Sequence, residues 1–116
     1  MDPIGMAKRF EQLNQRRAQV SLTLEHIEKE RREAEENTDW LDRAAYESRI
    51  ALLDRLRDWY AQERAEINEA LDRIAANQYG FCVACHQAID SQRLESFPQV
   101  AFCAACQEAR EGLERV

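Results

Sequence analysis

Two long stretches of the chain carry apolar side chains at a helical repeat, with spacings that alternate between three and four residues. In the first stretch the repeat runs through Phe10, Leu13, Arg17, Val20, Leu24, Ile27, Arg31 and Ala34. In the second stretch it runs through Ile50, Leu53, Arg57, Tyr60, Arg64, Ile67, Leu71 and Ile74. Such a repeat is typical of helices that pair along a narrow apolar seam. It predicts two helical arms, over about residues 6–36 and 42–77, with arginines that must reach sideways from the seam to acidic neighbours or water.

The segment between the arms, residues 37–44, reads NTDWLDRA. Asn, Thr and Asp favour turns and helix starts, so we expect the chain to reverse here. The arms then pair as an antiparallel coiled-coil hairpin, roughly 45 Å long, in which the numbers of facing residues sum to about 81. Leu13 would face Ile67 in this register. Gly80 is expected to end the second arm, because glycine readily adopts the left-handed conformation found at helix C-termini.

All four cysteines lie in the last third of the chain, in the pattern C-x2-C-x17-C-x2-C: Cys82, Cys85, Cys103 and Cys106. Two residues between thiols let one tight turn direct both sulfurs at one metal ion, and four thiolates in a tetrahedron suit zinc. With every position filled by sulfur, the site would be structural rather than catalytic. An iron–sulfur cluster and a redox-active dithiol remain as alternatives, and His86 is a possible competing ligand that we expect to be a bystander.

The cysteine-bearing segment, residues 78–116, is too short to bury an adequate core without metal. PQVAF before Cys103 alternates like a short strand, and a short C-terminal helix is expected from Cys103 onward. The predicted protein is therefore mainly α, with a helical hairpin over residues 1–77 and a small zinc-binding part over residues 78–116.

Composition narrows the functional classes. The chain is 33% charged with a net charge of −6, which disfavours general binding to nucleic-acid phosphates. Nine acidic and four basic residues between Glu25 and Glu47 place much of this charge near the turn, as a solvated face or as a probe for a positively charged cavity. No apolar run is long enough to span a bilayer, and no signal peptide is evident. A cytoplasmic, reducing location is expected, in which cysteines hold metal rather than form disulfides.

The cysteine spacing resembles that of the DksA/TraR family of bacterial transcription regulators. The RLE sequence at Arg93–Glu95, Pro98 and Gln107 fit the family pattern, and so does the D-x-x-D-x-A motif of the turn. In this sequence the motif comprises Asp39, Trp40, Asp42, Arg43 and Ala44. The resemblance covers about residues 6–110 and combines two separate motifs at the separation expected for the family.

The resemblance implies a monomeric, non-enzymatic regulator with one structural zinc ion. Family members insert the hairpin into the secondary channel of RNA polymerase, bring the tip near the catalytic magnesium and alter the lifetime of promoter complexes without reading DNA sequence. This chain departs from the family where His86 replaces a glycine, at some cost if the turn needs a positive φ. Trp59, Glu66 and Gln107 occupy positions that align with basic residues for guanosine tetraphosphate (ppGpp), so a response to ppGpp is doubtful.

Other interpretations of the same residues remain open. Asp39 as N-cap and Asp42 three residues later would form a capping box, although capping does not explain Trp40. The two aspartates could instead hold a catalytic metal, as in the Gre transcript-cleavage factors, although those proteins lack the cysteine cluster. A zinc-stabilised coiled-coil adaptor and a thiol-based redox switch are further alternatives.

Overall fold

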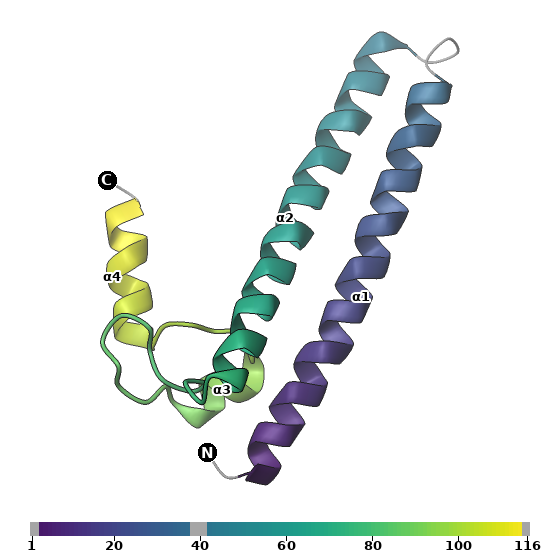
Figure 1. Cartoon of the computed structure of the whole chain (residues 1–116). Helices are drawn as coiled ribbons and strands as arrows, with labels where there is room; N and C mark the ends of the chain where they lie inside the picture. Colours follow the sequence, from purple (N-terminus) through teal and green to yellow (C-terminus); the bar gives the residue numbers. More distant parts are fainter. Residues whose placement is uncertain (1–2, 38–41, 115–116) are drawn as a thin grey trace. The chain divides into compact units, whose positions relative to one another are not determined.

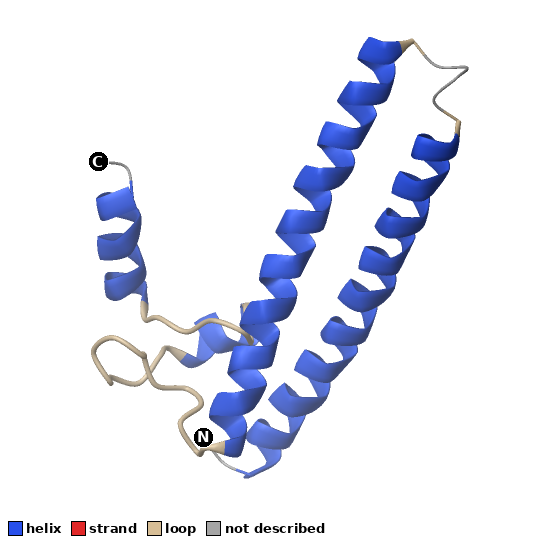
Figure 2. Ribbon diagram, turned by 45° about the horizontal axis from the view of Figure 1, so that its top comes forward, coloured by secondary structure: helices blue, strands red, loops and turns tan. Residues whose placement is uncertain are grey.

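The computed structural model describes residues 3–37 and 42–114, which form four helices. They are α1 (Pro3–Glu36), α2 (Arg43–Ala75), α3 (Ser91–Ser96) and α4 (Ala104–Glu114), labelled in Figure 1 and drawn in blue in Figure 2. Within these ranges there is no strand, only an isolated antiparallel bridge between Phe81 and Ala88. The mainly α prediction is confirmed, and the predicted short strand before Cys103 is wrong. None of the described helices combines the length and the apolar character needed to cross a bilayer.

The chain divides into two compact units, and both long helices run through both. One unit comprises Met1–Gln15 and Glu66–Val116, and the other comprises Arg16–Ala65. In each unit a segment of α1 lies beside an antiparallel segment of α2, as the predicted hairpin requires (Figures 1 and 2). The expected boundary at residue 77, between the hairpin and the zinc-binding part, divides the chain by sequence and does not correspond to these two units. It stays a prediction.

A narrow apolar stripe holds the two long helices together. On α1 the buried residues recur at every seventh position: Leu13, Val20, Ile27 and Ala34. On α2 the buried residues of the stripe include Leu53 and Ile67. Phe10, an expected seam residue, is 50% exposed. A side chain three residues from Leu13 points about 60° to one side of it, so Phe10 lies at the edge of the stripe that a single partner helix covers.

Ion pairs flank the stripe in the unit formed by residues 16–65. The guanidinium of Arg16 donates to Glu63 at 2.6 and 2.9 Å, and that of Arg31 donates to Asp54 at 3.0 Å. Both pairs join α1 to α2, and their residue numbers sum to 79 and 85, on either side of the predicted value of about 81. Arg31 also contacts Glu35 at 2.6 Å, so this seam arginine reaches sideways to acidic neighbours as expected.

Helix α2 ends at Ala75, and Asn77 rather than Gly80 is the left-handed residue that caps it. Asn77 has φ 57°, its N–H donates to the carbonyl of Ile74 at 3.1 Å, and the N–H of Gln78 donates to the carbonyl of Arg73 at 2.8 Å. This pair of bonds is a Schellman motif, in which a left-handed residue satisfies the last carbonyls of a helix. Gly80 also has a positive φ, 90°, but it serves the loop that follows.

Replacing Leu13 with alanine is expected to lower the free energy of unfolding by about 2–5 kcal/mol, because the side chain is 1% exposed and its removal leaves a cavity. Leu22→Ala is the matched control on the same helix, since Leu22 is 66% exposed and should cost about 0.5 kcal/mol or less. Urea unfolding followed by circular dichroism measures both. Equal losses for the two variants would contradict the seam described here.

Candidate metal centre

The first cysteine pair lies on a tight loop after α2. The N–H of Cys82 donates to the carbonyl of Gln87 at 2.8 Å, and the N–H of His86 donates to the carbonyl of Cys82 at 2.9 Å. His86 adopts φ 63°, in the left-handed region that a glycine would occupy without strain. The expectation that this position needs a positive φ is confirmed. Gly80 closes the base of the loop by accepting from the N–H of Ile89 at 2.8 Å.

The second pair lies at the start of α4. Cys103 immediately precedes the helix, and its carbonyl accepts the first helical hydrogen bond from the N–H of Gln107 at 2.9 Å. Cys106 is the third residue of the helix. The unpaired N–H groups and the dipole at a helix N-terminus favour negative charge, such as that of a metal-bound thiolate cluster.

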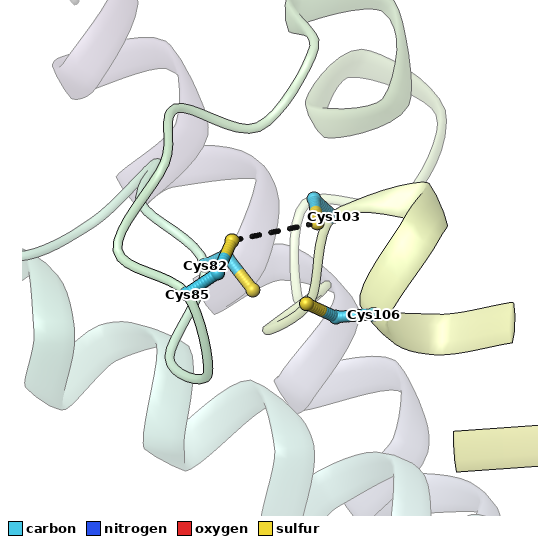
Figure 3. Close-up of side chains that lie close together, drawn as sticks. All are labelled: Cys82, Cys85, Cys103 and Cys106. Carbon is cyan, nitrogen blue, oxygen red and sulfur yellow. Dashed lines mark hydrogen bonds between the residues drawn. The ribbon is translucent and has the colours of Figure 1, made fainter. Parts of the chain in front are cut away.

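The fold brings the four cysteines together. Their sulfur atoms all lie within 4.8 Å of one another, and the Sγ atoms of Cys85 and Cys103 are 3.7 Å apart (Figure 3). Four sulfurs placed tetrahedrally at about 2.3 Å from zinc would be about 3.8 Å apart. The cluster therefore fits one structural zinc ion. Among the described residues, His86 does not belong to this group of potential ligands.

The electrostatics of the cluster also suit a bound cation. Burial alone would raise the pKa of the Cys82 thiol, but backbone N–H groups of Cys103, Cys85 and Ala84 outweigh it and bring this pKa to about 6. The neighbouring thiols, Cys103 first, raise the pKa of Cys106 to about 12. Four adjacent thiolates repel one another, and a dication at their centre removes that repulsion.

Three side chains hold the loop that carries the second pair. The hydroxyl of Tyr79 donates to the carbonyl of Pro98 at 2.8 Å in a buried bond. The guanidinium of Arg73 donates to the carbonyls of residues 99 and 100 at 3.4 and 3.3 Å, and that of Arg93 donates to the carbonyl of Phe102 at 3.1 Å. The carbonyl of Ala101 accepts from the backbone N–H of Val83 at 2.9 Å, so side chains and one backbone N–H together fix the loop at residues 98–102.

Sequence reasoning did not assign these roles. It singled out the RLE sequence only as part of the family pattern, whereas in the structure Arg93 holds the loop, Leu94 is buried and Glu95 lies 3.8 Å from Arg9.

Replacing Tyr79 with phenylalanine is expected to cost about 1–3 kcal/mol, because the carbonyl of Pro98 loses its buried donor. Zinc affinity should also fall, by about tenfold, since the loop that presents Cys103 is less well held. Competition with a chromogenic chelator measures the affinity. Tyr46→Phe, on the part of α2 in the other unit, is the control and should bind zinc like the unaltered protein.

The proposed tip residues are only partly described. Asp39 and Trp40 lie outside the described residues. Asp42, Arg43 and Ala44 are exposed, and Arg43 contacts Glu47 at 3.1 Å. Helix α2 begins at Arg43, and the carbonyl of Asp42 accepts from the N–H of Tyr46 at 3.0 Å. Asp42 therefore occupies the N-cap position, and the capping-box interpretation, which placed it three residues inside the helix, is wrong.

Two long antiparallel helices together with a four-cysteine cluster of this geometry define a mainly helical protein that carries a zinc finger. Residues 77–112 match the family described as the prokaryotic dksA/traR C4-type zinc finger. The DnaK suppressor protein of Agrobacterium tumefaciens is 32% identical, with a TM-score of 0.61 over 89% of this chain and 91% of that one. This chain belongs to the DksA/TraR zinc-finger family.

Further relatives are similar over much of the chain. The transcription factor DksA2 of Pseudomonas aeruginosa has a TM-score of 0.88 and 28% identity, over 100% of this chain and 90% of that one. The RNA polymerase-binding transcription factor DksA of Caulobacter vibrioides is 35% identical over 81% of this chain and 64% of its own length. For the protein of that name from Escherichia coli K12, the values are 31%, 88% and 66%. The chain thus spans just under two thirds of these curated relatives.

Proposed function

We propose that this protein regulates transcription by binding RNA polymerase through its secondary channel, with the hairpin tip near the catalytic centre. The observation that carries the proposal is the similarity of the whole fold to DksA2, together with relatives whose names state RNA polymerase binding. The protein would act by altering the lifetime of promoter complexes, without catalysing a reaction and without reading DNA sequence.

The charge of the hairpin suits this role. Glu25, Glu28, Glu33 and Glu36 are exposed on the half of α1 that leads toward the turn. Such a surface is attracted by the positive potential of a cation-containing cavity and repelled by free nucleic acid. Asp42, exposed at the start of α2, would approach the catalytic centre together with Asp39.

The zinc ion would serve the fold rather than the chemistry. Cys82, Cys85, Cys103 and Cys106 are proposed as its ligands, since their sulfurs form the cluster. Bound zinc supplies the attraction that keeps the loop after α2 and the start of α4 together. This part of the molecule would then present a fixed surface to polymerase beside the channel.

Binding to purified core polymerase tests the proposal directly. The zinc-loaded protein should bind core polymerase in a fluorescence-polarisation assay and shorten or lengthen the lifetime of an unstable promoter complex. A Gre-type cleavage factor that binds the secondary channel of the same polymerase should compete for binding. Absence of binding under low salt, where electrostatic attraction is strongest, would contradict the proposal. Cleavage of the transcript in a stalled elongation complex would instead indicate a Gre-like activity.

We expect ppGpp to add little to the effect of the protein on transcription. Phosphate groups are bound by lysine and arginine, and none occurs at Trp59, Glu66 or Gln107. Transcription from an unstable promoter, titrated with ppGpp with and without the protein, measures the interaction. The two effects should be simply additive. Strong synergy would show that other arginines bind the nucleotide.

A further inference from the structure

A groove lies beside α4 in the unit that holds the cysteine cluster. Its volume is about 500 Å³, and its lining includes Phe97, Val100 and Ala104. The Phe97 ring is 60% exposed, although it follows directly after α3, where a polar residue would cost nothing. The size suits one or two side chains of a partner, and an exposed aromatic ring in a concave site is typical of a binding surface.

One wall of the groove is acidic. Glu108 and Glu111 line it from α4, three residues apart and therefore on the same face of the helix. The amide of Gln107 donates to Glu111 at 3.1 Å and so orients that carboxylate. Both carboxylates are exposed, and a partner cation could approach them without passing through the protein.

The neighbouring cations neutralise this wall only in part. Arg110, the basic residue of α4, lies over the ring of Phe102 at 4.3 Å and does not line the groove. Arg93 lines the groove and contributes one positive charge beside the two carboxylates, while its Nε donates to the carbonyl of Phe102. The groove thus combines apolar side chains with two carboxylates on α4 and one guanidinium, so its lining carries a net negative charge.

We propose that this groove binds a basic, amphipathic element of RNA polymerase. An apolar side chain of that element packs against Phe97 and Val100, and a lysine or arginine beside it pairs with Glu108 and Glu111. The inference rests on the proposed function, because it names the surface and the chemistry of the same partner. An anionic ligand would be repelled by the two carboxylates, and a purely apolar one would leave them unpaired.

Charge reversal tests the groove against polymerase. The double variant Glu108→Lys, Glu111→Lys should bind core polymerase about fivefold to thirtyfold more weakly, with a smaller dependence of affinity on salt. Glu11→Lys, an exposed change on α1 in the same unit, is the control and should bind like the unaltered protein. If the unaltered protein binds and the double variant binds equally well, the groove inference is wrong while the proposed function stands. If the unaltered protein does not bind, the proposed function itself fails.

A second experiment addresses the groove without polymerase. Butylguanidinium and butyl sulfate share an apolar tail and differ in charge, so they form a matched pair of probes for NMR of the zinc-loaded, ¹⁵N-labelled full chain. Butylguanidinium should shift the amide signals of Phe97, Val100 and Glu108 saturably, and the shifts should disappear in the double variant. Equal shifts with butyl sulfate, or no shifts with either probe, would overturn the assignment.

A second copy of this chain is the competing occupant. Sedimentation equilibrium over a range of protein concentrations distinguishes it, because self-association through the groove would raise the average mass and the double variant would abolish that rise. A mass that stays at that of one chain, combined with weaker polymerase binding by the variant, supports the assignment made here. A dimer that depends on Glu108 and Glu111 would refute it.

Discussion

Replacing Cys82 with serine is expected to abolish stoichiometric zinc binding and to unfold the chain from about residue 79 onward. Cys82 is 1% exposed and its sulfur belongs to the four-sulfur cluster. Structural zinc sites contribute about 10–16 kcal/mol in small zinc-finger peptides, far more than the apolar core of a segment this short can replace. Cys106→Ser should behave in the same way. The segment Arg16–Ala65, which forms its own unit, should stay helical.

The structure sharpens this expectation at the base of the hairpin. Arg9 of α1 lies 3.8 Å from Glu95, and Arg73 of α2 donates to carbonyls of the loop before Cys103, so loss of the metal site removes contacts from both long helices there. Hydrogen exchange measured by mass spectrometry should therefore rise in residues 3–15 and 66–75 as well as after residue 79. Exchange in residues 16–65 should change much less.

His86→Asn is the matched control for the cysteine variants. It alters the residue next to Cys85 and keeps a side chain that tolerates φ 63°. Its zinc content, measured by mass spectrometry of the metal, should remain one ion per chain. If Cys82→Ser retained an ordered C-terminal part without zinc, the structural role of the metal would be refuted. If His86→Asn lost zinc, His86 would be a ligand and not a bystander.

Replacing Asp42 with asparagine is expected to abolish regulation while leaving folding and polymerase binding intact. Asp42 is the N-cap of α2, and asparagine caps a helix about as well as aspartate, so the free energy of unfolding should change by about 0.5 kcal/mol or less. If the carboxylate acts near the catalytic centre, its loss removes that effect. Most of the contact with polymerase would lie elsewhere on the molecule.

The measurement for Asp42 is paired, on one preparation of the variant. A binding curve to core polymerase gives the affinity, and the decay of an unstable promoter complex gives the regulation. Asp58→Asn, an exposed carboxylate on the same helix, is the control and should keep both. Parallel loss of binding and regulation would assign Asp42 to docking. Unchanged regulation would remove its carboxylate from the mechanism and leave a helix cap.

Long-range side-chain bonds account for much of what sequence reasoning missed. Tyr79 and Pro98 are separated by 19 residues, and Arg73 and Val100 by 27. The spacing of residues along the chain does not predict such a bond. An arginine on a helix has the same pattern of neighbours in the sequence whether its side chain lies in solvent or binds a distant carbonyl. The alternation of PQVAF predicts a strand, but four of its five carbonyls accept from the side chains of Tyr79, Arg73 and Arg93 and no partner strand lies beside it in the described part of the chain.

Local positions were misjudged where two residues compete for one role. Gly80 was expected to end α2, and it does have a positive φ, but Asn77 reaches the left-handed conformation first and completes the Schellman bonds. The left-handed conformation costs asparagine little conformational free energy compared with most other non-glycine residues. At His86, by contrast, the positive φ implied by the glycine that the family carries there is present.

The sequence by itself determined the features that repeat or that depend on short spacing. The seven-residue recurrence of Leu13, Val20 and Ile27 defined the seam, because one helix can bury only one face against one partner. The cysteine spacing defined the zinc site, because few ions suit four thiolates. Only the tertiary structure decided which side chains hold the loop before Cys103, that Phe97 stays exposed, and that Glu108 and Glu111 line a groove beside it. These depend on how α3, α4 and the loop between them pack, and the free energies that choose among such packings are sums of many small contacts between residues far apart in the chain.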